Sequence, residues 1–171
     1  MLKPYTVSLF GHRIIADTHH ASSELEKIIS HLILTKEYVE FLIGRNGDFD
    51  ILAASIIRRC IKRYDRANTS LTLILPYPTA EFARNEEYYL SYYDSVEIFS
   101  SSRKTHFKAA FSLRNKYMAD RSDLIICCID HSGGGAYNAV KYALSLNKQF
   151  YNTASTPPPE LSDPQNIYRF P

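Results

Sequence analysis

The stretch LIICCIDHSGGGAYNAVKYAL, residues 124–144, carries the clearest structural signal in the chain. It begins with a continuous apolar run, residues 124–129, of the kind found in strands that are buried on both faces of a sheet. After the glycines, apolar residues recur at the spacing of one helix face: Ala136, Ala139, Val140, Ala143 and Leu144. A buried strand that leads through a short loop into a helix is the repeating unit of parallel α/β proteins.

The same alternation of strand and helix extends over most of the chain. Further strand-like runs occupy residues 5–10, 38–43, 71–75, 96–99 and 150–151. Helix-face spacing recurs in two of the intervening segments, at Leu25, Ile28, Ile29, Leu32 and Ile33, and at Ala53, Ile56, Ile57, Cys60 and Ile61. Ser23 and Glu26 have the spacing of a capping box, which predicts the start of the first helix. We therefore expect an α/β fold, a Rossmann-like three-layer α/β/α sandwich with a mainly parallel sheet.

Length and composition favour a single domain followed by a short tail. The chain has 171 residues, and we assign residues 1–154 to one Rossmann-like domain. Residues 155–171 contain Pro157, Pro158, Pro159 and Pro164, which predicts an extended C-terminal tail. Residues 76–94 are rich in tyrosine and glutamate and lack clear periodicity. They form either an irregular helix with an exposed aromatic surface, serving as a lid or a homo-oligomer contact, or a short solvated helix with a few packed rings.

Several classes of protein are disfavoured by composition. No apolar run is long enough to span a bilayer, and residues 1–4 show no signal peptide, so we expect a cytoplasmic protein without membrane contact. The net charge of +2, with scattered lysines and arginines, argues against a nucleic-acid partner. The three cysteines have neither disulfide-framework nor zinc-site spacing, and we expect them to be buried. We predict no metal site and no resident cofactor.

In a parallel sheet, ligands bind beyond the carboxyl ends of the strands, where the strand order reverses. Three loops that follow strands are therefore candidate phosphate sites. The first is Gly11-His12-Arg13, in which arginine offers a fork of donors. The second is Gly44-Arg45-Asn46-Gly47, before a helix start at which Asp48 is a candidate cap and Asp50 a candidate partner for ribose hydroxyls.

The third loop, Ser132-Gly133-Gly134-Gly135, is the strongest candidate. It holds half of the six glycines of the chain at a strand-to-helix junction, where backbone N–H groups and the helix dipole favour a phosphate. Arg114 is a further candidate, because helical spacing places it on an apolar face with Phe107, Ala110, Phe111 and Met118. A charge there needs a protein carboxylate, a ligand in the cleft or access to water.

Together these motifs resemble the SLOG superfamily, named for the DprA/Smf and LOG proteins. The resemblance covers about residues 5–152, and five motifs carry it: Phe10-Gly11-His12-Arg13, the residue 44–50 loop, Arg114-Asn115-x-x-Met118, Ser122-Asp123, and Ser132-Gly133-Gly134-Gly135 with Tyr142-Ala143. The resemblance implies a Rossmann-like domain that binds a nucleotide or a nucleotide-derived ligand such as an ADP-ribose compound. It also adds Asn115 to the candidate binding residues.

The resemblance also raises the question of catalysis. LOG enzymes hydrolyse nucleoside 5′-monophosphates with an arginine and a glutamate; Arg114 and Met118 match the arginine motif, whereas Ala139 falls at the glutamate position. Without that carboxylate, hydrolysis should be severely impaired. We therefore expect binding or sensing of a nucleotide-derived small molecule. The alternative is a LOG-like nucleoside 5′-monophosphate phosphoribohydrolase with altered catalytic residues, for which Arg114 and Asp130 are the candidates, and His12 or Asp50 could replace the glutamate.

Overall fold

A parallel sheet forms the centre of the molecule. A computed structural model of the chain describes residues 3–99, 107–162 and 165–171. Within them, six strands pair in parallel in the order β4-β3-β2-β1-β5-β6. Their bounds are Tyr5–Gly11 (β1), Val39–Ile43 (β2), Thr69–Leu75 (β3), Ser95–Ile98 (β4), Leu124–Cys128 (β5) and Gln149–Asn152 (β6). All six predicted strands are confirmed, and the sheet is parallel throughout.

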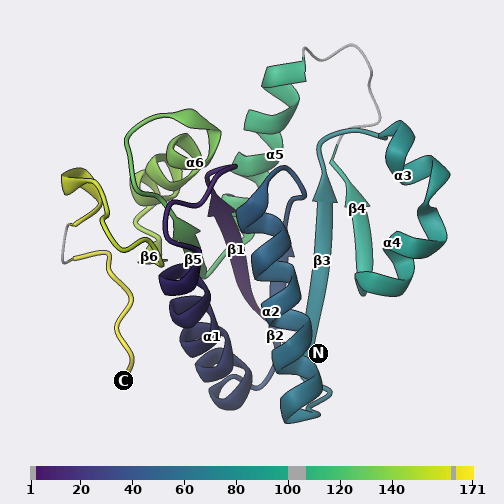
Figure 1. The fold of residues 1–171 in the computed structure, drawn as a ribbon, viewed down its shortest axis with the longest axis horizontal. Helices are drawn as coiled ribbons and strands as arrows, with labels where there is room; N and C mark the ends of the chain where they lie inside the picture. Colours follow the sequence, from purple (N-terminus) through teal and green to yellow (C-terminus); the bar gives the residue numbers. More distant parts are fainter. Residues whose placement is uncertain (1–2, 100–106, 163–164) are drawn as a thin grey trace.

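Helices cover both faces of the sheet, which confirms the predicted three layers (Figure 1). Helices α1 (Thr18–Thr35) and α2 (Asp48–Tyr64) pack together on one face, and α5 (Phe107–Arg121) and α6 (Gly134–Ser145) pack together on the other. The chain first moves outward from β1 to β4 and then returns to β5 and β6. Because crossovers between parallel strands are right-handed, this reversal moves the later helices to the opposite face. The two resulting apolar layers bury all three cysteines.

The first helix begins earlier than the capping box predicts. Asp17 is the N-cap, and its side chain accepts a hydrogen bond from the His20 backbone N–H at 2.9 Å. Ser23 therefore lies inside α1, and the capping-box prediction is wrong. Glu26 has a different partner, because α2 packs beside α1 and presents Arg59 at 3.0 Å together with Arg63.

The tyrosine-rich segment forms two short helices beside the edge strand β4 (Figure 1). These are α3 (Ala80–Arg84) and α4 (Glu86–Tyr92). The rings of Tyr89 and Tyr93 pack into the core, whereas Tyr88 and Leu90 are exposed. The segment thus combines packed rings with an exposed apolar surface, and its role in oligomerisation stays a prediction.

The segment after residue 154 packs against the rest of the protein. A short 3₁₀ helix, η1 (Pro159–Leu161), buries Leu161, and farther on Ile167 forms a parallel bridge with Phe150 of β6. Phe150 N–H donates to the Asn166 carbonyl at 2.9 Å, and Tyr168 N–H donates to the Phe150 carbonyl at 2.8 Å. The segment therefore covers part of the β6 edge. The division of the chain after residue 154 stays a prediction.

Candidate functional site

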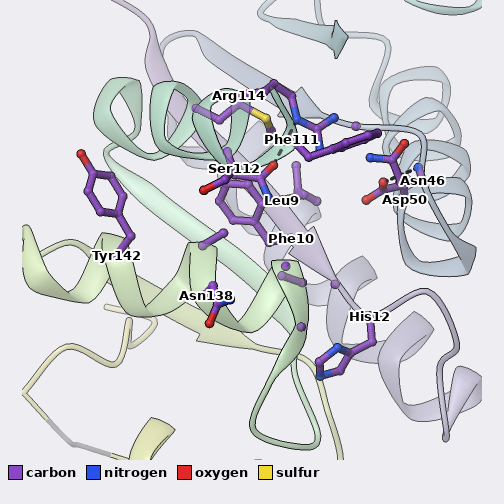
Figure 2. Close-up of a pocket in the computed structure, with 18 of the residues that line it drawn as sticks. Leu9, Phe10, His12, Asn46, Asp50, Phe111, Ser112, Arg114, Asn138 and Tyr142 are labelled. Atoms are coloured by element: carbon purple, nitrogen blue, oxygen red, sulfur yellow. Dashed lines mark hydrogen bonds between the residues drawn. The ribbon is translucent and has the colours of Figure 1, made fainter. Parts of the chain in front are cut away.

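A cavity of about 790 Å³ opens beside the carboxyl ends of β1 and β2 and the helices that follow (Figure 2). It adjoins the place where the strand order turns from β1 to β5, as expected for a ligand site in this class of sheet. Its size suits a small-molecule site. Four of the predicted loop glycines line it together: Gly11, Gly44, Gly134 and Gly135. The other predicted residues that line it are His12, Arg13, Asn46, Asp50, Arg114 and Asn115.

The third loop, residues 132–135, leads into α6 with open space around its glycines. Gly133 and Gly134 have φ values of 113° and 84°, which side-chain-bearing residues rarely adopt. Gly135 is different, because its φ is not positive and a Cβ atom built there would meet no atom within 4 Å. Neither backbone strain nor crowding by the protein therefore explains a glycine at position 135. No side chain caps α6, whose N-cap is Gly133.

The second loop, residues 44–50, is filled by the protein itself. A Cβ atom at Gly44 would lie 2.6 Å from Arg114 Nη1, and one at Gly47 would lie 2.5 Å from Arg13 Cα. Two backbone donors also have protein partners. Asn46 N–H donates to Asp50 Oδ2 at 2.8 Å, and Asp48 N–H donates to the Arg13 carbonyl at 2.8 Å. The Asp50 carboxylate thus accepts from a backbone N–H group that we expected to bind an external anion.

Arg114 lies in the cavity wall and is only 5% exposed. Its Nε donates to Asn115 Oδ1 at 3.0 Å, and its Nη1 donates to the Ile74 carbonyl at 3.0 Å. The Asn46 amide oxygen, in the orientation that satisfies both of its polar atoms, accepts from Nη2 at 3.1 Å. The sequence left a carboxylate, a ligand or water as partners for this charge. The structure instead provides neutral carbonyl and amide acceptors of the protein. Figure 2 shows the guanidinium on the same side of the cavity as Asn46 and Asp50.

Burial shifts the pKa values of both charged groups in this wall. It lowers the pKa of the Arg114 guanidinium from its ordinary value, and the Asp50 carboxylate opposes that change. It raises the pKa of Asp50, while the Asn46 N–H and Arg114 act in the opposite direction. Among the described residues that line the cavity, Asp50 is the one carboxylate. This side of the site therefore holds a charge pair that each partner helps to keep ionised.

The first loop meets the end of β5 at His12. The His12 ring stacks on His131 with centroids 3.8 Å apart, and its Nε2 lies 3.7 Å from Asp130 Oδ1. Burial and His131 lower the pKa of His12, which the Asp130 charge partly opposes. Asp130, a candidate catalytic residue, is not among the residues that line the cavity.

The remaining predicted residues also lie outside the cavity lining. Arg45 extends toward the tyrosine-rich segment, with its guanidinium carbon 4.9 Å from the Tyr89 ring centre. Ser132 donates a hydrogen bond to Glu160 of the C-terminal segment. Gly47 packs against Arg13, and Gly133 precedes the lining residues of α6. The side chain of Phe107, expected on the Arg114 face, lies outside the described residues.

Sequence reasoning missed several lining residues that helical periodicity could have found. Asn138 and Tyr142 share a face of α6 with Gly135 and Ala139, at positions i, i+3, i+4 and i+7. On α5, Ser112 and Lys116 also line the cavity, beside the predicted Arg114 face. Ala139 itself lines the cavity, so the position at which the LOG resemblance expects a glutamate does face the site.

The comparisons with known proteins identify the fold. The sequence matches no protein-family model, and no curated protein is similar to it in sequence. Solved structures do match. DprA from Helicobacter pylori, described for its single-stranded DNA binding mode, gives a TM-score of 0.63 at 14% identity, over 87% of this chain and 65% of that chain. DprA from Streptococcus pneumoniae gives 0.62 at 13% identity, over 87% of this chain and 50% of that chain. The chain has a DprA-like, Rossmann-like fold, the fold that the resemblance to the SLOG superfamily implies.

A second group of solved structures matches over more of its own length. The molybdenum cofactor carrier protein from Chlamydomonas reinhardtii gives a TM-score of 0.57 at 15% identity, over 93% of this chain and 81% of that chain. By contrast, the chain spans only about half to two thirds of the DprA structures. Because a DprA structure is described for DNA binding, the expectation against a nucleic-acid partner finds no support here. In the described part of the chain, no helix combines the length and apolar character that a membrane crossing requires.

Proposed function

We propose that the cavity binds a phosphate-bearing nucleotide or nucleotide-derived ligand, and that the phosphate lies at the start of α6. The observation that carries the proposal is Gly135, a glycine that lines the cavity without a backbone or packing reason of its own. A glycine in the first turn of a helix lets a phosphate approach backbone N–H groups closely. The positive end of the helix dipole favours the same anion.

The rest of the cavity suits the less polar part of such a ligand. Phe10 and Phe111 line it and provide aromatic surface for a planar ring. Asn138 on α6 contributes an amide, as Figure 2 shows, and Tyr142 contributes its ring, because its hydroxyl donates to Asp120 Oδ1 at 2.7 Å. An amide both donates and accepts hydrogen bonds, so Asn138 can contact the polar edge of a base or the hydroxyls of a ribose. A nucleotide and an ADP-ribose compound both offer these parts.

Binding without strong catalysis fits the site better than hydrolysis. Ala139 lines the cavity at the position of the expected glutamate and cannot stabilise a positively charged transition state. Asp130 is not among the lining residues, and its carboxylate faces His12 and His131. One observation favours the alternative, a phosphoribohydrolase with altered residues: the Asp50 carboxyl does line the cavity, and burial raises its pKa.

Two measurements test the proposal and its alternative. Native mass spectrometry of the purified chain, followed by calorimetric titration with AMP and with ADP-ribose, should detect one bound nucleotide-type ligand. Incubation with nucleoside monophosphates should release free base at no more than a trace rate. Failure of both titrations contradicts nucleotide binding. Base release that disappears in Asp50→Asn would establish the enzyme instead.

We also propose a homo-oligomer, with α4 at the contact. Tyr88 and Leu90 are 55% and 52% exposed on this helix, and exposed apolar clusters often mark interfaces. Sedimentation velocity of the chain should give more than a monomer, and Leu90→Glu should shift the distribution toward monomer. Sedimentation of the unmodified chain as a monomer at micromolar concentration contradicts this proposal.

A further inference from the structure

Three metal-ligating side chains meet where β1 and β5 end: His12, Asp130 and His131. The parallel register pairs Gly11 with Cys128, so the residues that follow both strands emerge side by side. One ligand atom from each of the three, an imidazole nitrogen or a carboxylate oxygen, lies within 4.8 Å of the other two. His12 is more than a hundred residues from the other two in sequence, which explains why spacing patterns did not reveal the group.

The contacts within this group converge on Asp130 Oδ1. His131 Nδ1 forms a hydrogen bond with this oxygen, and His12 Nε2 lies 3.7 Å from it. The backbone carbonyl of His131 lies 3.3 Å from the same His12 nitrogen. Two imidazoles, a carboxylate and a carbonyl oxygen are thus gathered in one place. All of these groups carry lone pairs that a transition-metal cation can accept.

The histidine rings differ in how firmly they are held. The His12 side chain is 10% exposed, whereas the His131 side chain is 64% exposed. The rings are stacked at an interplanar angle of 10°. A metal bound by an imidazole lies in the plane of the ring, so two stacked rings do not aim their nitrogens at the same point. His131 is exposed enough to rotate about its side-chain bonds and aim its nitrogen at an ion held by His12 and Asp130.

We propose that His12, Asp130 and His131 bind one divalent transition-metal ion, of the class of Zn²⁺ or Co²⁺. Ions of this class bind imidazole nitrogens readily, whereas Mg²⁺ and Ca²⁺ bind mainly oxygen ligands, so two imidazoles and one carboxylate favour a transition metal. Three protein ligands leave at least one coordination position open. The nearest atom to a Cβ built at Gly134 is His12 Nδ1, at 3.9 Å, so the adjoining space is open to water or to an oxygen anion.

The proposal is independent of nucleotide binding and has its own test. The full-length chain, freed of metal with a chelator and then of the chelator, is titrated with Zn²⁺ by calorimetry and with Co²⁺ by visible absorption. One equivalent should bind, with a Co²⁺ spectrum of nitrogen and oxygen ligands. His12→Gln and Asp130→Asn should each weaken Zn²⁺ binding by about tenfold or more, since even residues that merely orient metal ligands contribute about that much.

The matched control is the double variant His19→Gln with His20→Gln, two histidines in the first turn of α1 that are outside the group. Its Kd for Zn²⁺ should be within about twofold of that of the unmodified chain, because neither histidine belongs to the proposed ligand group. Absence of an equimolar Zn²⁺ complex overturns the proposal. So does a complex that persists unweakened in His12→Gln, or a Co²⁺ spectrum with thiolate bands, which would indicate the cysteines.

A variant that retains the fold keeps the test decisive. His131→Gln changes an exposed ring, so its thermal unfolding should match that of the unmodified chain, while its Zn²⁺ affinity should fall about tenfold. Unchanged affinity in this folded variant contradicts the three-ligand site and would mean that His131 only forms a hydrogen bond with Asp130 in the unmodified chain. Titration with AMP in the presence of chelator separates this outcome from failure of the nucleotide proposal.

Discussion

The second and third post-strand loops look alike in sequence but differ in what occupies the space beside their glycines. In the residue 44–50 loop, a Cβ at Gly44 or Gly47 would collide with Arg114 or with the backbone of Arg13. In the residue 132–135 loop, the corresponding space is empty around all three glycines apart from His12, at 3.9 Å from Gly134. The first kind of glycine allows the protein to pack against itself. The second kind leaves room for something else.

The comparison gives a rule for choosing between glycine-rich loops. Close packing or a positive φ is a structural reason for glycine, and five of the six glycines in the chain have one. Gly135 has neither, and replacing glycine within a helix normally adds stability. A residue that a folded chain does not need for its fold is a better candidate for binding than one that it does. The variants below test this distinction.

Loss of the side chain that fills the second loop should have the largest effect. Arg114→Ala removes a buried guanidinium and leaves the Ile74 carbonyl and the Asn115 amide oxygen without their donor. We expect a loss of about 3 kcal/mol in the free energy of unfolding, measured by urea denaturation. Lys116→Ala, an exposed change on the same helix, should cost less than about 0.5 kcal/mol. Equal stability of the two variants would mean that Arg114 serves the ligand rather than the fold.

A single methyl group should distinguish the two loops directly. Gly47→Ala places a Cβ 2.5 Å from Arg13 Cα, and backbone cannot rotate away as a side chain can. We expect a loss of about 2 kcal/mol in the free energy of unfolding, within the range for overpacked sites. Gly135→Ala should leave it unchanged or raise it by up to about 1 kcal/mol. If both variants lose the same stability, the contrast between the loops is not one of packing.

The fold could be predicted from the sequence because its signals are local. Strands such as β5 consist wholly of apolar residues, and the helix that follows, α6, shows one apolar face, so both elements are recognisable within their own segments. The start of α1 was missed for a related reason. Asp17 and Ser23 are both acceptable caps, and a local pattern does not say which one the packing of α1 on α2 will select.

The site was only partly predictable because its contacts are not local. The glycines, Arg114 and Asn46 were found from their positions after strands and on a helix face. That Arg114 would bind the Ile74 carbonyl, forty residues away, depends on how α5 lies over β3. The hydrogen bond from Ser132 to Glu160, which lies in a segment expected to be a tail, depends on the same kind of long-range packing. Residue types indicated which groups could bind a ligand, whereas the hydrogen-bond partners of those groups depend on the fold.

A larger side chain at Gly135 should weaken nucleotide binding with little change in stability. The Gly135→Val side chain would occupy open space at the start of α6 and keep a phosphate from the backbone donors. We expect the Kd for AMP or ADP-ribose, measured by calorimetry, to rise about tenfold, which corresponds to about 1.4 kcal/mol. Gly135→Ala should have a smaller effect in the same direction. The same substitution at Gly134 is less informative, because φ there is 84° and a side chain would strain the backbone.

An unchanged Kd in folded Gly135→Val would remove the phosphate from the third loop. The open space beside the three glycines would then need another explanation. Binding that survives there but is lost in Asn46→Ala would move the ligand toward the second loop, which contains the Asp50 carboxylate and would disfavour a phosphate.

The smallest effect should come from Glu160, whose carboxylate accepts hydrogen bonds from Ser132 and, at 2.8 Å, from the Tyr137 hydroxyl. These contacts join the C-terminal segment to the start of the third loop and to the first turn of α6, and they lower the pKa of Glu160. Glu160→Gln keeps the shape but removes the charge, and two opposite results are possible. If the carboxylate holds the loop in place, AMP should bind about twofold more weakly, or by about 0.4 kcal/mol, because hydrogen bonds to a neutral acceptor hold the loop less firmly. If it only repels the phosphate, AMP should bind more tightly.

Salt separates the two results for Glu160. Repulsion between exposed charges is screened when the Debye length falls to about 3 Å in about 1 M salt, whereas the position of a loop is not. We expect the twofold weakening in Glu160→Gln to persist under those conditions, relative to the unmodified chain in the same buffer. Glu87→Gln, which removes a similar exposed charge on α4, should leave AMP binding unchanged. Tighter binding in Glu160→Gln that disappears at high salt would show that the C-terminal segment acts on the third loop through its charge alone, and the loop would then hold its open shape without help.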